Sequence, residues 1–428
     1  MWAPVTTAAP ITTSLADRYQ AIRDQTEALA SVLSPEDQVV QSMPDVSPTK
    51  WHRAHITWFF ETFLLVANGA KPVEEYYGYL FNSYYESVGE RHARADRGLI
   101  TRPNNTEVAD YRRRVDAAMH TLMSSDLGAE PETIALIELG LHHEQQHQEL
   151  LLMDIKHVLS CNPFAPAYIE RATPTHAAVP ELGWLDREGG IVGIGHAGEG
   201  FHFDNEGPRH RALVSPHRLA DRLVTNGEWL QFMAAGGYAD PALWLSSGWH
   251  TINAEGWDSP MYWQRSDDGW AAHTLVGTHP IDPSEPVVHV SYFEADAFAR
   301  WAGARLPTEF EWESAAAELG VDGNFLGADS LHPTRAAGQG LRQMFGDVWE
   351  WTSSAYGPYP GFTPAAGAVG EYNGKFMIDQ QVLRGGCCVT PDGHMRATYR
   401  NFFPTQSRWM FSGVRLADNG PAESGGGQ

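Results

Sequence analysis

The sequence predicts an α+β multidomain protein, with an N-terminal four-helix bundle followed by a mixed domain rich in irregular structure. A chain of 428 residues is longer than one ordinary hydrophobic core accommodates. Residues 1–165 hold only six of the forty-one glycines and three of the fifteen tryptophans, so loop-rich sequence begins after them. We therefore divide the chain into a bundle (1–165), a linker (166–180), a second domain (181–420) and a tail (421–428).

Four segments of the first part have apolar residues at helical spacing. These segments are residues 14–33, 47–68, 105–124 and 131–160. Ser47 and Pro48 suit the N-cap and first turn of the second helix, and Gly69 suits its end. Bundles of this kind commonly build metal sites from side chains on facing helices.

The fourth helix carries a pair of histidines, His143 and His147, one helical turn apart. Residues at this spacing lie on one face of a helix and can bind the same metal ion. The pair also fits two buried histidines with a structural role. A third interpretation is zinc hydrolysis, because His143 to His147 matches H-E-x-x-H with Glu144 as general base, although the chain lacks the glycine and third histidine of the extended motif.

The second helix supplies a candidate third ligand. His55 shares an apolar stripe with Trp51, Trp58 and Phe59, so we expect its side chain to point into the bundle. His52 is three residues earlier and is the alternative ligand. Either histidine together with the pair on the fourth helix would complete a three-histidine metal site.

A long connection, residues 69–104, follows the second helix, and such loops inside compact domains are usually functional. Tyr84 and Tyr85 could donate a proton or hydrogen bond near a metal. Spaced arginines, Arg91 and Arg94 with Arg97 beyond them, could bind a substrate carboxylate. Packing tyrosines and surface ion pairs are the structural alternative.

Composition limits the possible partners and location. Thirty basic and fifty-three acidic residues give a formal charge of −23, which argues against binding nucleic acid or an anionic membrane. We find no run of eighteen apolar residues and no secretory signal, and therefore expect a cytoplasmic protein. The three cysteines, Cys161, Cys387 and Cys388, form no disulfide framework.

The second domain contains two capping boxes and several distinctive motifs. They are Val224-Thr225-Asn226, Ser291 to Glu294 and Thr308 to Glu311 within 289–317, Phe345 to Thr352, Leu383 to Gly386 and Ser412 to Arg415. Residues 180–418 thereby resemble the formylglycine-generating-enzyme, or sulfatase-modifying-factor, fold, which is C-type-lectin-like. That family uses a spaced cysteine pair after its Arg-Gly-Gly. Here Cys387 and Cys388 adjoin the motif, so we expect structural cysteines rather than formylglycine synthesis.

The bundle resembles the DinB-like metal proteins, and the whole chain resembles the ergothioneine-biosynthesis sulfoxide synthases, the EgtB family. Their His-x-x-x-His-x-Glu signature matches His143, His147 and Glu149, and their upstream ligand in an Ala-His-Ile context matches His55. The resemblance implies that three imidazoles hold Fe(II). It also implies that O2 drives the joining of a thiol sulfur to the imidazole C2 of hercynine (Nα-trimethylhistidine), with oxidation of that sulfur to a sulfoxide.

The same resemblance implies roles for substrate-binding residues. Arg91 and Arg94 match the arginine pair that binds the thiol substrate, and Gln146 matches the glutamine that contacts hercynine. Asn401 and Phe402 match the segment at the betaine end of the pocket, where an aromatic face would attract a trimethylammonium group.

Two departures from the better-known members bear on the thiol substrate. Phe403 stands where those members have an acid that helps to bind γ-glutamylcysteine. Val369 stands where they place their catalytic tyrosine, and Tyr372 matches a neighbouring tyrosine of theirs. Tyr84 and Tyr85 resemble the tyrosine pair of a second type, which uses cysteine directly. We therefore expect cysteine as the thiol. The alternatives are γ-glutamylcysteine, a selenoneine- or ovothiol-type homologue, and a non-catalytic zinc-binding or carbohydrate-recognising module.

Overall fold

The computed structural model describes residues 14–171, 179–267, 269–365, 368–371 and 373–420. The chain forms two compact units, each with its own core. Of the described residues, the first contains those up to Glu170 together with those of the stretch 365–372, and the second contains the rest. The expected tail, and the linker between 172 and 178, lie outside the described residues.

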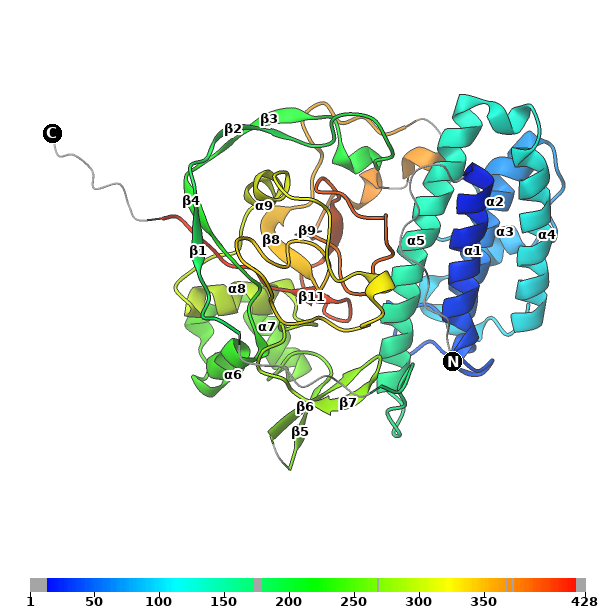
Figure 1. Cartoon of the computed structure of the whole chain (residues 1–428). Coiled ribbons are helices and arrows are strands. Elements are labelled where there is room, and N and C mark those ends of the chain that lie inside the picture. Colours follow the sequence, from blue (N-terminus) through cyan, green and yellow to red (C-terminus); the bar gives the residue numbers. More distant parts are fainter. Residues whose placement is uncertain (1–13, 172–178, 268, 366–367, 372, 421–428) are drawn as a thin grey trace. The chain divides into compact units, whose positions relative to one another are not determined.

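The first unit is the expected helical bundle. Its long helices are α1 (Leu15–Ser31), α2 (Thr49–Phe60), α4 (Asn105–Met123) and α5 (Pro131–Ser160), and they lie side by side (Figure 1). Capping boxes at Ser14 and Asn104 start α1 and α4. Tyr168 is buried and its hydroxyl donates to the Leu29 carbonyl (2.6 Å), which holds the residues after α5 against α1.

The start of α2 corrects one expectation. Ser47 is not the N-cap, which is Pro48 and makes no side-chain capping bond. The Ser47 N–H instead donates to Oδ2 of Asp154 on α5 (2.8 Å), so this turn is fixed by a neighbouring helix. The helix continues through a π-helical turn, Glu61–Leu65, and a 3-10 turn, and it ends at Gly69 (φ +90°) as expected.

The connection after α2 is partly helical. It contains the short helix α3 (Tyr77–Phe81) and a 3-10 turn at Arg94–Leu99. The irregular segment between them, 82–93, carries the two tyrosines of interest.

In its described residues, the second unit contains four small sheets and four short α-helices. The sheet orders are β1-β4-β12, β10-β9-β8-β11, β2-β3 and β5-β6-β7, with β11 and β8 parallel and the other pairs antiparallel. The strands are β1 (Trp184–Arg187), β2 (Gly190–Ile194), β3 (His210–Val214), β4 (His217–Ala220), β5 (Trp263–Ser266), β6 (Gly269–Thr274), β7 (Gly277–Pro280), β8 (Trp349–Ala355), β9 (Gln380–Arg384), β10 (Asn401–Pro404), β11 (Ser412–Gly413) and β12 (Ala417–Asp418). The helices are α6 (Asn226–Ala234), α7 (Ser246–Glu255), α8 (Tyr292–Trp301) and α9 (Glu309–Ala316).

Side-chain hydrogen bonds hold this irregular unit together. Both expected capping boxes, at Ser291 and Thr308, are present, and Thr225 forms a third at the start of α6. In its core, the buried Arg415 forms two bonds to Glu350, which also accepts from the indole of Trp312. No helix among the described residues of either unit is long and apolar enough to cross a membrane.

Candidate metal centre

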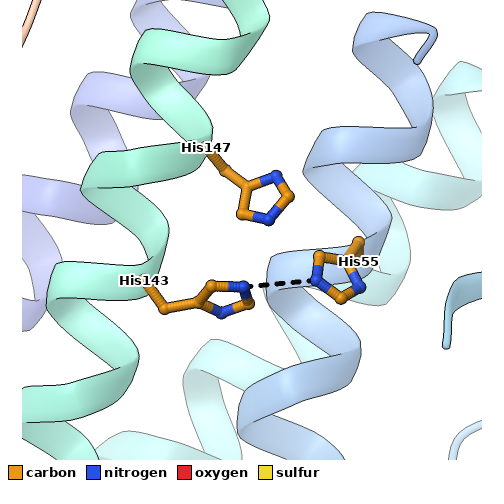
Figure 2. Close-up of side chains that lie close together, drawn as sticks. All are labelled: His55, His143 and His147. Atoms are coloured by element: carbon orange, nitrogen blue, oxygen red, sulfur yellow. Dashed lines mark hydrogen bonds between the residues drawn. The ribbon is translucent and has the colours of Figure 1, made fainter. Parts of the chain in front are cut away.

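Three histidines of the bundle converge on one point. His55 comes from α2, and His143 and His147 come from consecutive turns of α5 (Figure 2). One ring nitrogen from each histidine lies within 4.8 Å of the other two, and all three side chains are buried. The Nε2 atoms of His55 and His143 are 3.3 Å apart. This geometry would let a single metal ion contact all three rings.

Aromatic rings enclose the three histidines. The His55 ring stacks on Trp51 (4.6 Å between centroids, 8° between planes) and also lies against Trp58 (5.7 Å). Phe59 packs against His143 at 4.7 Å. Because these aromatics share the helix face of His55, the apolar stripe of α2 becomes a water-excluding wall of the site.

All three histidines are held in the neutral form that binds metals. Burial lowers the pKa of His143 to about 3, and burial is also the leading cause that holds the pKa values of His55 and His147 well below their usual range. The Nδ1 of His55 lies 2.6 Å from the Phe81 carbonyl oxygen. A carbonyl only accepts, so this nitrogen carries the proton and leaves the Nε2 lone pair for a metal.

His52, the alternative ligand, has a different place. Its Nδ1 lies 2.8 Å from Nδ1 of His147, and its Nε2 lies 3.1 Å from Oδ2 of Asp154. Asp154 is not among the residues predicted above. The available signal was a buried acid in the apolar run Leu150 to Ile155, two helical turns after His147 and on the same face.

The structure shows that the H-E-x-x-H interpretation is wrong. Glu144 is fully buried on another face of α5, where it accepts hydrogen bonds from Arg23 (3.0 Å), Thr26 (2.7 Å) and Arg112 (3.1 Å). Two guanidinium groups neutralise this carboxylate. Glu144 therefore links α1, α4 and α5 and is not placed to act as a general base for a metal-bound water.

The tyrosine segment begins directly after a residue that contacts His55. The residue after Phe81 is Asn82, whose side chain accepts from the Tyr85 N–H (3.0 Å) and donates to the carbonyls of Tyr85 (2.9 Å) and Gly89 (3.2 Å). The Tyr85 ring is fully buried and lies 5.9 Å from Trp58. Trp58 therefore lies against both this ring and that of His55.

Burial also sets the protonation of the tyrosine pair. It raises the pKa of Tyr85 above its usual range, against the opposing effect of the neighbouring Tyr84 hydroxyl. The rings of Tyr84 and Tyr85 are 4.6 Å apart, and Tyr84 is half-buried. Tyr85 thus keeps its phenolic proton at neutral pH, as a hydrogen-bond donor requires.

A glutamate distant in sequence binds the backbone directly after Tyr85. The carboxylate of Glu371 accepts from the backbone N–H groups of Glu86 and Ser87, at 3.0 Å each. Glu371 lies in the stretch 365–372, which belongs to the bundle unit. The neighbouring Tyr372 lies outside the described residues.

The expected arginine pair lies on the surface of the bundle unit. Arg91 forms an ion pair with Glu86, and Arg94 donates to the Asp45 carbonyl. The buried arginine is Arg97, whose guanidinium carbon is 3.4 Å from the ring centroid of Trp51. Gln146 is half-buried on α5, beside His147.

The remaining predicted residues lie in β10 of the second unit and are half-buried. Phe402 stacks on Tyr356 (4.0 Å, 10°), Phe403 meets Trp409 edge-on (5.5 Å), and the Asn401 side-chain oxygen accepts from the Phe402 N–H. Cys387 and Cys388 are fully buried and form no disulfide.

Comparison with known proteins agrees with this organisation. Residues 18–151 match the DinB superfamily, and residues 183–337 and 329–420 match the sulfatase-modifying factor enzyme 1-like domain. The chain is 33% identical over 440 residues to the hercynine oxygenase of Mycolicibacterium smegmatis, covering 94% of this chain and 98% of that protein. The chain belongs to the hercynine oxygenase family. The family resemblance expected from the sequence is thereby confirmed.

Two further relatives extend this result. The hercynine oxygenase of Mycobacterium tuberculosis is 33% identical over 403 residues, covering 87% of this chain and 91% of that protein. Ergothioneine biosynthesis protein 1 of Schizosaccharomyces pombe is 26% identical over 232 residues, covering 51% of this chain and 28% of that protein. As a member of the hercynine oxygenase family, the protein is an oxygenase, and its three clustered histidines fit a metal-dependent one.

Proposed function

We propose that this hercynine oxygenase joins the sulfur of cysteine to the imidazole C2 of hercynine in ergothioneine biosynthesis and oxidises that sulfur to a sulfoxide. The reaction breaks one C–H and one S–H bond and forms a C–S and an S–O bond. One oxygen atom of O2 enters the sulfoxide, and the other leaves as water with the two hydrogens. The close approach of His55, His143 and His147 is the observation that carries the proposal.

The donor set fits Fe(II). Three neutral imidazoles without a carboxylate leave a divalent metal with its full charge and with open positions, which an oxygenase needs for its substrates. Imidazole also suits zinc and copper, so the choice of iron rests on the oxygenase family. When bound, Fe(II) would provide open positions for O2 and the substrates and carry electrons between them, while hercynine and the thiol would supply the four electrons that reduce O2.

The residues around the histidines would prepare the site for this chemistry. The rings of Trp51, Trp58 and Phe59 exclude water and so protect reactive species from hydrolysis and stray protons. Tyr85, or Tyr84 through it, would donate a proton or hydrogen bond to the reduced oxygen or the developing sulfur–oxygen group. We retain Gln146, Asn401 and Phe402 as proposed hercynine contacts on the family resemblance.

Removing the tyrosine hydroxyls is expected to change the product. We expect Tyr84→Phe/Tyr85→Phe to slow sulfoxide formation by about a hundredfold or more, the usual contribution of a positioned acid. Cysteine would then be oxidised without joining hercynine. Product analysis by mass spectrometry and O2 uptake would measure both routes.

Tyr77→Phe is the matched control, because Tyr77 lies in the same connection and packs on Phe81 and Tyr111. It should leave the product ratio unchanged. An unaltered sulfoxide yield in the double variant would remove the tyrosine pair from the mechanism.

The thiol substrate is a separate prediction. Phe403 is apolar and packs against Trp409, so it offers no carboxylate to the ammonium group of a γ-glutamyl moiety. We keep Arg91 and Arg94 as the proposed partners of the carboxylate of the thiol substrate. Arg91 would release Glu86 when it binds this carboxylate. We expect cysteine, and not γ-glutamylcysteine, to support coupled O2 uptake.

The test uses anaerobically purified, Fe(II)-loaded protein with hercynine and each thiol in turn. Formation of hercynyl-cysteine sulfoxide with cysteine, and of no coupled product with γ-glutamylcysteine, supports the assignment. The γ-glutamyl product would keep the reaction and reverse the thiol assignment, whereas uncoupled O2 uptake with both thiols would refute the proposed reaction.

A further inference from the structure

The second ring nitrogen of His147 has an unusual partner, another histidine. His55 hydrogen-bonds to a backbone carbonyl through its second nitrogen, but Nδ1 of His147 lies 2.8 Å from Nδ1 of His52. Nε2 of His52 is in turn 3.1 Å from Oδ2 of Asp154. His52, His147 and Asp154 are all at least nine-tenths buried, so these contacts are shielded from competing water.

The chemistry of the groups sets the direction of each hydrogen bond. Oδ2 of Asp154 already accepts from the Ser47 N–H (2.8 Å), and a carboxylate oxygen has no proton to give. Nε2 of His52 therefore donates to Asp154. With Nδ1 of His147 engaged by His52, only Nε2 of His147 can bind a metal, and a ligand nitrogen carries no proton. The proton of His147 is thus on Nδ1 and is donated to Nδ1 of His52, which accepts.

We propose that His52 and Asp154 are positioning residues that fix the tautomer and ring orientation of His147 for metal binding. The inference rests on the proposed metal site and adds to it. Partners of this kind make a ligating imidazole more basic and hold its ring in place. Here the chain runs from His147 on α5 to His52 on α2 and back to Asp154 on α5, so it also ties together the two helices that supply all three ligands.

The contact of Asp154 with Ser47 gives the network a fixed end. Ser47 lies just before the N-cap of α2, five residues before His52. Ser47 Oγ also accepts from Nη1 of Arg97 (2.9 Å), the arginine that covers Trp51. Asp154 therefore receives two donors, the backbone N–H of Ser47 just before α2 and the ring of His52 within α2.

The experiment measures Co(II) affinity of the full-length apoprotein by competition with a chromophoric chelator, together with the visible absorption of the bound Co(II). We expect His52→Phe and Asp154→Leu each to weaken Co(II) binding by about 10–100-fold, the usual effect of losing such a partner. The double variant should bind Co(II) no more weakly than the single variant with the lower affinity, because the two residues act through one chain of hydrogen bonds. His52→Asn should recover much of the affinity, since its amide oxygen lies near the position of Nδ1 and can accept from His147.

His120→Phe is the control. His120 is a half-buried histidine of α4 that bonds to Gln20 and does not belong to the network. Thermal unfolding of each apoprotein separates loss of fold from loss of metal. Wild-type Co(II) affinity and absorption in both His52→Phe and Asp154→Leu would overturn the inference.

Failure of the proposed function would give a different result. If the wild-type protein binds Co(II) but the iron form couples no thiol to hercynine, the function is refuted and the Co(II) titration still decides the role of His52 and Asp154. A wild-type protein that binds no Co(II) overturns both.

Discussion

Replacing His143 with glutamine should lower the affinity of the enzyme for Fe(II) by more than about a hundredfold and abolish measurable sulfoxide formation. Loss of a residue that hydrogen-bonds to a metal ligand already lowers metal affinity by ~10–100-fold, and loss of the ligand itself should lower it more. The Nε2 of His143 lies 3.3 Å from that of His55, so its loss removes one of the three nitrogens that converge on the metal position. Iron content after anaerobic reconstitution and O2 uptake with hercynine and cysteine measure the two effects.

His120→Gln provides a comparison, since it removes a bundle histidine whose Nε2 bonds to Gln20 across α1 and α4, away from the metal site. It should keep its iron and its activity. Full iron content in His143→Gln would show that the metal lies elsewhere and would contradict the assignment of the triad.

Removing the Glu144 carboxylate should strongly lower the stability of the bundle unit. Glu144→Ala leaves two fully or nearly fully buried guanidinium groups, Arg23 and Arg112, without their shared partner. Arg23 keeps Asp116 and Arg112 keeps Glu27, but both carboxylates are less buried than Glu144. We therefore expect a loss of up to about 3–5 kcal/mol, the cost of breaking a buried ion pair from one side. Such a loss approaches the whole stability of many domains, which is ~5–15 kcal/mol. Chemical denaturation of the metal-free protein, followed by circular dichroism, measures the change in the free energy of unfolding.

Glu132→Ala is the control for this experiment. Glu132 lies exposed in the first turn of the same helix, and its loss should change the free energy of unfolding by less than about 0.5 kcal/mol. Equal effects of the two substitutions would contradict the structural role assigned to Glu144. The same experiment bears on the hydrolase interpretation, in which Glu144 would be a dispensable residue for folding and an essential one for chemistry.

The sequence was a good guide wherever a property depends on local periodicity. The four long helices follow from apolar spacing, and the two histidines on α5 and the stripe around His55 are consequences of the same 3.6-residue period. The π-helical turn at Glu61–Leu65 leaves no such trace, because the apolar pattern runs on through it. The N-cap of α2 was mispredicted since Ser47 is held by a residue of another helix.

Contacts between distant segments could not be predicted in the same way. Asp154 reaches His52 across 102 residues, and Glu371 reaches Glu86 across 285. Each depends on how two elements are rotated about one another, and a pattern along a single element does not encode that rotation. The three spaced arginines are a similar case, because only the position of the Trp51 ring makes Arg97 the buried one.

The stretch 365–372 has a consequence for how this protein can be divided and recombined. The bundle unit is not a continuous piece of chain, since it borrows an acid from between two parts of the second unit. A gene fragment ending near residue 170 would encode every histidine of the triad but not the side chain that holds the segment after Tyr85. Transplanting the bundle onto another partner domain, by recombination or by design, therefore requires that the new partner also supply a loop with an equivalent carboxylate.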